Sequence, residues 1–245
     1  MSTPNSAKVG LGVTAFLAFV GVVVPVLANV LNPTLLLNAL VAIALGAATA
    51  IVQRSLARRS QRRALAGALR LWPPTRVADA DVAPLGVYPP YEHDHRPSPY
   101  VERPRHEDQA VREALNESDI VVLHGPAGAG KSRAASEAAA RVLSQDVAFV
   151  PLNAGALRLI ADRSIEMDLP KGRVCLWLDS AERFVEALDA RALESLKQLA
   201  PHGVKVVATI RSQQWEELLV GTGQSSDAAR ALDAQATVLA LGPRQ

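Results

Sequence analysis

Hydrophobic and polar positions alternate regularly in the C-terminal part of the chain, from residue 106 to residue 245. Short apolar runs typical of buried strands alternate with stretches of helical periodicity. The apolar runs predict strands at 119–124, 147–152, 173–179, 204–210 and 237–241. The helical spacing predicts helices at 107–116, 131–143, 154–165, 181–199, 213–220 and 227–234. Strands that alternate with helices favour an α/β fold with a mainly parallel five-stranded sheet flanked by helices.

The N-terminal part has a different pattern, since no charged residue or histidine occurs from Val9 to Gln53. A helix needs about 20 residues to cross a bilayer, so two crossings fit. The Asn32-Pro33 pair is a helix-stopping turn in the middle of this stretch. We therefore expect residues 1–53 to form a transmembrane helical hairpin, with spans at about 9–31 and 34–53.

Two other interpretations of the uncharged stretch remain open. The first is that the first span is a cleaved signal peptide with Val26-Leu27-Ala28 as its small-residue site, although its apolar run is long for a signal peptide. The second is that the stretch forms core helices of a soluble protein, although 45 uncharged residues leave no polar face to meet water. The hairpin interpretation accounts for the pattern best.

Basic residues follow the second predicted span and set its expected orientation. They predict a basic juxtamembrane helix over 54–72, and by the positive-inside rule they place both termini in the cytoplasm. The sequence thus predicts a multi-pass protein of the plasma membrane with the lipid bilayer as a partner. Anionic headgroups account for the basic cluster in a chain of net charge +2, so no specific nucleic-acid binding is expected. The cluster contains Arg54, Arg58, Arg59, Arg62, Arg63 and Arg70.

Residues 73–105 are expected to be a proline-rich linker without a core of its own, because half of the 16 prolines lie there. The His93-Asp94-His95 cluster in this segment is interpreted as solvated rather than metal-binding. The single cysteine, Cys175, lies in an apolar run and predicts a buried, inert thiol.

A glycine-rich loop follows the strand at 119–124. From Gly125 the chain reads GPAGAGKS, which matches the phosphate-binding pattern G-x-x-x-x-G-K-S between a strand and a helix. Its glycines let successive backbone N–H groups face one anion, Lys131 supplies a point charge for the phosphates, and Ser132 offers a hydroxyl to a metal ion. The residues expected to bind nucleotide are Gly125, Pro126, Ala127, Gly128, Ala129, Gly130, Lys131, Ser132 and Arg133.

A carboxylate ends the buried-type strand VCLWLD at 174–179. We expect Asp179 to hold Mg²⁺, usually through water, together with the hydroxyl of Ser132. The alternative is that Asp179 only caps the helix that follows it.

The fourth predicted strand, at 204–210, contains Thr209 near its end and is followed by Arg211. In many P-loop ATPases a polar or basic residue at the tip of the strand between the two motif strands senses the terminal phosphate, so both are candidates, Arg211 as a catalytic residue. A surface arginine that ends a strand is the alternative for Arg211.

The segments GPAGAGKS, LWLDSAERF at 176–184 and VVATIR at 206–211 together resemble the nucleotide-binding core of STAND-type ATPases. These are signal-transducing relatives of AAA+ proteins, and the likeness is to actinobacterial members with an N-terminal membrane hairpin. The resemblance implies an ATP- and Mg²⁺-dependent switch that acts on a protein effector or by self-association.

One residue departs from that family. Members commonly carry a second acid directly after the Asp179 position to polarise the attacking water, whereas this chain has Ser180. Glu182 is the candidate that replaces it, beside Asp179 and Arg211 as the other catalytic candidates.

The leading hypothesis is therefore a membrane-anchored, STAND-like signalling NTPase switch with weak or conditional Mg²⁺-dependent ATP hydrolysis. One alternative is a P-loop kinase acting on a small molecule or protein, for which residues 221–230 are the only lid-like segment. The other is a non-catalytic nucleotide-binding membrane scaffold.

Overall fold

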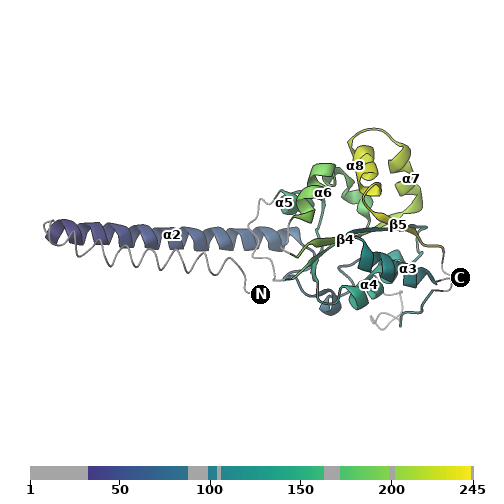
Figure 1. Cartoon of the computed structure of the whole chain (residues 1–245), viewed down its shortest axis with the longest axis horizontal. Coiled ribbons are helices and arrows are strands. Elements are labelled where there is room, and N and C mark those ends of the chain that lie inside the picture. The colour runs from purple at the N-terminus through teal and green to yellow at the C-terminus, as the bar shows by residue number, and fades with distance from the viewer. Residues whose placement is uncertain (1–32, 88–98, 104–105, 163–171, 199–201, 244–245) are drawn as a thin grey trace. The chain divides into compact units, whose positions relative to one another are not determined.

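A computed structural model describes residues 33–87, 99–103, 106–162, 172–198 and 202–243 of the chain (Figure 1). The chain divides into two compact units, Met1–Arg59 and Ser60–Gln245, which are described separately. The His93-Asp94-His95 cluster and the first predicted span lie outside the described residues.

Helix α2 (Pro33–Ala68) corrects the predicted transmembrane hairpin. In the described part of the chain, no helix has the length and apolar character that a membrane span requires. The helix continues without a break from its apolar residues into turns that carry Arg54, Arg59 and Arg63, so it is not apolar along its whole length. The expected second span at 34–53 and the multi-pass plasma-membrane location are therefore wrong, as is the hairpin part of the predicted fold class.

The C-terminal unit contains the predicted five-stranded sheet. Its strand order is β2-β3-β4-β1-β5, and every pairing is parallel. The P-loop strand β1 and the Asp179 strand β3 thus lie on either side of β4, as the sequence suggested. The strands are β1 (Ile120–Gly125), β2 (Val147–Phe149), β3 (Val174–Leu178), β4 (Val204–Arg211) and β5 (Thr237–Ala240).

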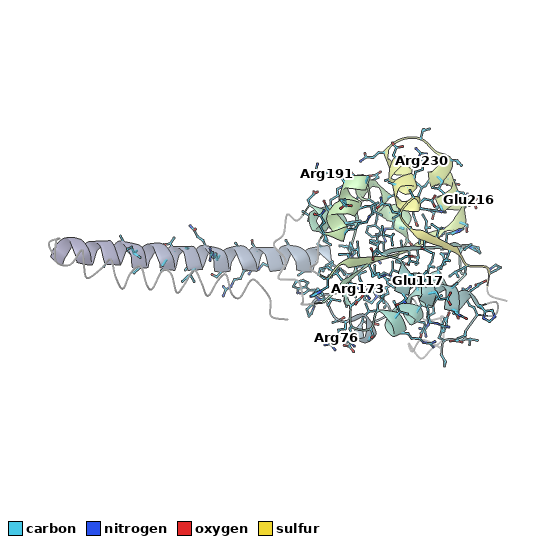
Figure 2. All side chains as sticks on the ribbon, viewed as in Figure 1. Arg76, Glu117, Arg173, Arg191, Glu216 and Arg230 are labelled. Carbon is cyan, nitrogen blue, oxygen red and sulfur yellow. The ribbon has the colours of Figure 1, made fainter. Side chains whose placement is uncertain are left out.

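Helices cover both faces of the sheet (Figure 1). On one face α3 (Glu107–Glu117) and α4 (Lys131–Val142) pack over a cluster that contains Leu115, Leu123 and Trp177. The other face is covered by α5 (Ala154–Ala161), α6 (Ala190–Lys197), α7 (Ser212–Val220) and α8 (Gln224–Asp233). Figure 2 shows side chains filling both layers, with Arg230 on the α8 side and Glu117 on the α3 side.

One predicted helix, 181–199, is divided in the structure. Two short 3₁₀ turns, Ala181–Arg183 and Val185–Ala187, precede α6. The break occurs at Asp189, whose side chain accepts a hydrogen bond from the backbone N–H of Ala192 and so begins a new helix. Helical periodicity alone did not separate these pieces.

Cys175 on β3 is fully buried, as predicted. Burial raises the pKa of its thiol to about 12, with a smaller contribution from the nearby carboxylate of Asp146. A thiol with so high a pKa carries almost no reactive thiolate near neutral pH, which fits a structural role.

Residues 69–87, which we name the N-terminal strap, belong to the C-terminal unit although the sequence suggested a coreless linker from residue 73. The strap forms two antiparallel bridges at the sheet edge, Arg76↔Val147 to the strand β2 and Leu69↔Pro151 to the segment just after it. It includes the short 3₁₀ turn η1 (Val77–Asp79), which contacts α4. The hydrophobic side chains of the strap that are buried in the core are Leu69, Val77, Leu85 and Val87.

A chain that begins at Tyr100 is expected to lose cooperative folding, because it lacks the strap. Burial of one large apolar side chain stabilises a fold by about 1.5–3 kcal/mol, and the lost set is comparable to the whole stability of a small domain. Thermal unfolding followed by circular dichroism measures the effect, with a chain that begins at Ser60 as the control. A cooperative transition of the shorter chain at the same temperature as the control would contradict the assignment.

Candidate nucleotide site

The glycine-rich loop connects β1 to α4 in the geometry that the sequence predicts. Gly128 and Gly130 have φ angles of 73° and 74°, in the left-handed region that glycine adopts without strain. Helix α4 begins at Lys131, directly after the loop, so its N-terminal N–H groups face the loop. The Lys131 ammonium group folds back and donates to the carbonyl oxygens of Gly125 at 3.1 Å and Pro126 at 2.9 Å.

Asp179 lies next to this loop at the carboxyl end of β3. Its Oδ1 atom accepts hydrogen bonds from the hydroxyl groups of Ser132, at 2.6 Å, and Thr209, at 2.8 Å. These three residues come from α4, β3 and β4, and they meet because β4 lies between β1 and β3. Hydroxyl and carboxylate oxygens are the ligands that Mg²⁺ prefers, so the donor set fits the metal that the sequence predicts.

A cavity of about 400 Å³ opens over these residues. Asp179, Glu182 and Arg211 line it, as do six of the nine predicted loop residues. The other three have different environments: Gly125 packs against the carbonyl of Leu241, Ala129 is buried, and Pro126 is exposed. The loop residues in the cavity wall are Ala127, Gly128, Gly130, Lys131, Ser132 and Arg133.

The charges around the cavity suit an anion. Burial lowers the pKa of Lys131, and the positive charge of Arg211 lowers it further, while Asp179 and Glu182 raise it. Lys131 and Arg211 lie close enough to repel each other electrostatically, so a negative ligand between them would be stabilised by both. The electrostatics therefore agree with the phosphate-binding geometry of the loop.

Glu182 reaches the cavity through an unusual backbone turn. Ser180, the residue that stands where an acid was expected, has a φ angle of 59°, which is uncommon for a residue other than glycine. The chain then enters the turn Ala181–Arg183, and Glu182 lines the cavity. Its Oε2 atom is buried and has no hydrogen-bond partner among the described residues, which is costly for a carboxylate.

Two features of the site were not predicted from the sequence. Thr209, which the sequence offered only as a phosphate-sensing candidate, donates its hydroxyl to Asp179 and so holds the carboxylate. Gly86 and Val87 of the strap line the cavity. No local sequence signal indicates the second feature, because Gly86 and Val87 lie at least 40 positions from the other residues of the cavity wall. The hydrogen bond from Trp177 Nε1 to the Leu85 carbonyl oxygen likewise joins residues 92 positions apart.

A second cavity, of about 480 Å³, lies between the start of α3 and the end of β5. Arg103 is buried nearby, and its guanidinium group donates to Glu107 and to the carbonyl oxygen of Gly242. These bonds tie the end of β5 to the start of α3. The sequence analysis did not single out Arg103.

Comparisons with known proteins identify no family for the chain. No family model matches it, and no curated protein matches it. A solved structure described as "Structural Basis for Katanin Self-Assembly" is similar with a TM-score of 0.35 and 15% sequence identity over 57% of this chain. The match covers 51% of that structure's chain, so this chain spans about half its length.

The class of fold follows from the chain's own geometry. A parallel sheet with β4 between the loop strand and the carboxylate strand, a glycine-rich loop that begins a helix, and a serine hydroxyl bonded to the carboxylate are together P-loop NTPase-like. The predicted α/β core is confirmed in this respect.

Proposed function

We propose that the chain binds ATP with Mg²⁺ and acts as a STAND-like signalling switch with weak or conditional ATP hydrolysis. The observation that carries the proposal is the convergence of the loop, Asp179 and Arg211 on one cavity at the carboxyl ends of three neighbouring strands. Open parallel α/β sheets bind their ligands at this edge.

The loop residues bind the phosphates. The amide groups of Gly128 and Gly130 and the N-terminus of α4 face the anion, and Lys131 exchanges its two loop carbonyls for phosphate oxygens. Bound Mg²⁺ supplies positive charge that offsets the phosphate charge. Ser132 and Asp179 would hold the ion, and Arg211, which lines the same cavity, would contact the outer phosphates.

Glu182 supports slow hydrolysis. The Glu182 carboxylate lines the cavity, and a rotation of its side chain would let the buried, unpartnered Oε2 atom accept a hydrogen bond from a water molecule there and orient it or take its proton. Its position three residues after Asp179 provides the acid that Ser180 lacks. Restricted hydrolysis fits a switch whose bound state acts on a protein effector or promotes self-association, as the STAND resemblance implies.

The kinase alternative receives less support. The lid-like segment, residues 221–230, consists of the short α7–α8 connection and the first turns of α8. Arg230 on α8 donates to the carbonyl oxygens of Leu219 and Gly221 and to Asp227. Arg230 thus holds that connection together and does not line the cavity.

Binding of labelled ATP to the full chain, with and without Mg²⁺, tests the proposal. We expect saturable binding that Mg²⁺ strengthens, and phosphate release without an added acceptor. Release that requires an acceptor would favour a kinase, and binding without release would favour the non-catalytic alternative. Absence of ATP binding would refute the proposal.

A further inference from the structure

We propose that Gly86 of the N-terminal strap positions the Asp179 carboxylate, so that the strap responds to the metal and nucleotide bound in the cavity. This inference rests on the proposed ATP- and Mg²⁺-binding function and adds a regulatory element to the same site. The strap precedes the P-loop in the sequence and belongs to neither β1 nor β3, the strands that carry the loop and Asp179.

Gly86 lies directly against the carboxylate. Its φ angle is 80°, and a Cβ atom built on it would overlap the carboxylate atoms of Asp179. Only glycine both adopts this backbone conformation readily and leaves room for the carboxylate. The Oδ1 atom of Asp179 is held by Ser132 and Thr209, while Oδ2 is the atom nearest the position of that Cβ.

Trp177 makes a second connection between the strap and β3. Its buried indole N–H donates to the carbonyl oxygen of Leu85 at 2.9 Å. Trp177 and Asp179 are two positions apart, so side chains there point to the same face of an extended chain. The strap is therefore held at Leu85 and meets the carboxylate at Gly86, its next residue.

Metal binding would act on this arrangement through Asp179. The hydroxyl of Ser132 donates to Asp179 at 2.6 Å and keeps its oxygen lone pairs for a cation, so a bound Mg²⁺ or its water shell would attract the carboxylate while this bond stays in place. Gly86 blocks movement of the carboxylate toward the strap unless the strap moves with it. Rearrangement of Asp179 is thus transmitted to residues 82–87, whose backbone forms the turn bonds Leu85 N–H to Val82 O and Gly86 N–H to Ala83 O.

The Gly86→Ala variant of the full chain tests the positioning role. The added methyl group displaces the Asp179 carboxylate, so we expect Mg²⁺ to strengthen ATP binding at least 10-fold less than in the unchanged chain. Binding without Mg²⁺ should fall by less, because the methyl group meets the Asp179 carboxylate and not the phosphate-binding loop directly. Gly203→Ala is the matched control, since Gly203 has a φ angle of 88° and no atom within 4 Å of its Cβ position.

Equal effects of both variants, or equal losses with and without Mg²⁺, would show a general structural role and overturn the positioning role. Hydrogen exchange of amides 82–87 in the unchanged chain gives a second test that does not depend on folding of the variant. We expect their exchange to change with ATP and Mg²⁺ but not with ATP and a chelator. Unchanged exchange in a chain that binds ATP would overturn the inference alone, whereas absence of ATP binding would refute the proposed function itself.

Discussion

Replacement of Lys131 with alanine is expected to weaken ATP binding about 100-fold. The ammonium group is the closest cation that the loop offers to the phosphates, and charge-assisted hydrogen bonds of this kind contribute about 1.5–3 kcal/mol each. A loss of about 2.7 kcal/mol corresponds to a 100-fold change in affinity. Isothermal titration of the full chain with ATP and Mg²⁺ measures the effect.

The Lys131→Ala variant should fold normally, because within the described residues the ammonium group bonds to two loop carbonyls at the cavity and to no core residue. Lys197→Ala is the matched control, since Lys197 is exposed on α6 and donates to Gln235 away from the cavity. Equal ATP affinity in the Lys131 variant and the control would show that the loop is not a phosphate site.

The Glu182→Gln variant is expected to release phosphate about 100-fold more slowly than the unchanged chain, while ATP affinity changes by less than about threefold. Glutamine has the shape of glutamate but does not take a proton from water, and a general base contributes about 10²- to 10⁴-fold to such a reaction. The buried, unpartnered Oε2 atom is the group affected. Single-turnover phosphate release under saturating ATP separates this step from binding.

Glu186→Gln is the control for this experiment, because Glu186 is exposed on the next 3₁₀ turn and does not line the cavity. An unchanged rate of phosphate release in the Glu182 variant would show that the carboxylate takes no part in the reaction. Reduced binding in parallel with reduced release would instead indicate that Glu182 shapes the site and does not act on water.

Local patterns were sufficient for most of the C-terminal unit. Apolar runs such as Val174–Leu178 are short and fully buried, so a few consecutive residues are enough to predict a strand. The P-loop was equally predictable, since its glycines, lysine and serine are consecutive and each has a local geometric reason.

Patterns of hydrophobicity alone were less reliable at the N-terminus and after Asp179. An uncharged stretch satisfied the length condition for membrane spans, but the described helix α2 runs on into arginine-bearing turns and does not qualify as one. Helical spacing over 181–199 did not reveal the Asp189 cap, because a cap changes the backbone direction without changing the periodicity.

The sequence by itself determined the strands, the phosphate-binding loop and the acid that ends β3, because these depend on neighbouring residues. Only the tertiary structure decided that Ser132 and Thr209 share one oxygen of Asp179, that Glu182 lines the cavity with its Oε2 atom buried, and that Gly86 meets the carboxylate. These contacts depend on strand order and on the path of the strap across the sheet. Strand order and the path of the strap depend on packing of the whole unit, so they cannot be predicted from a short stretch of residues.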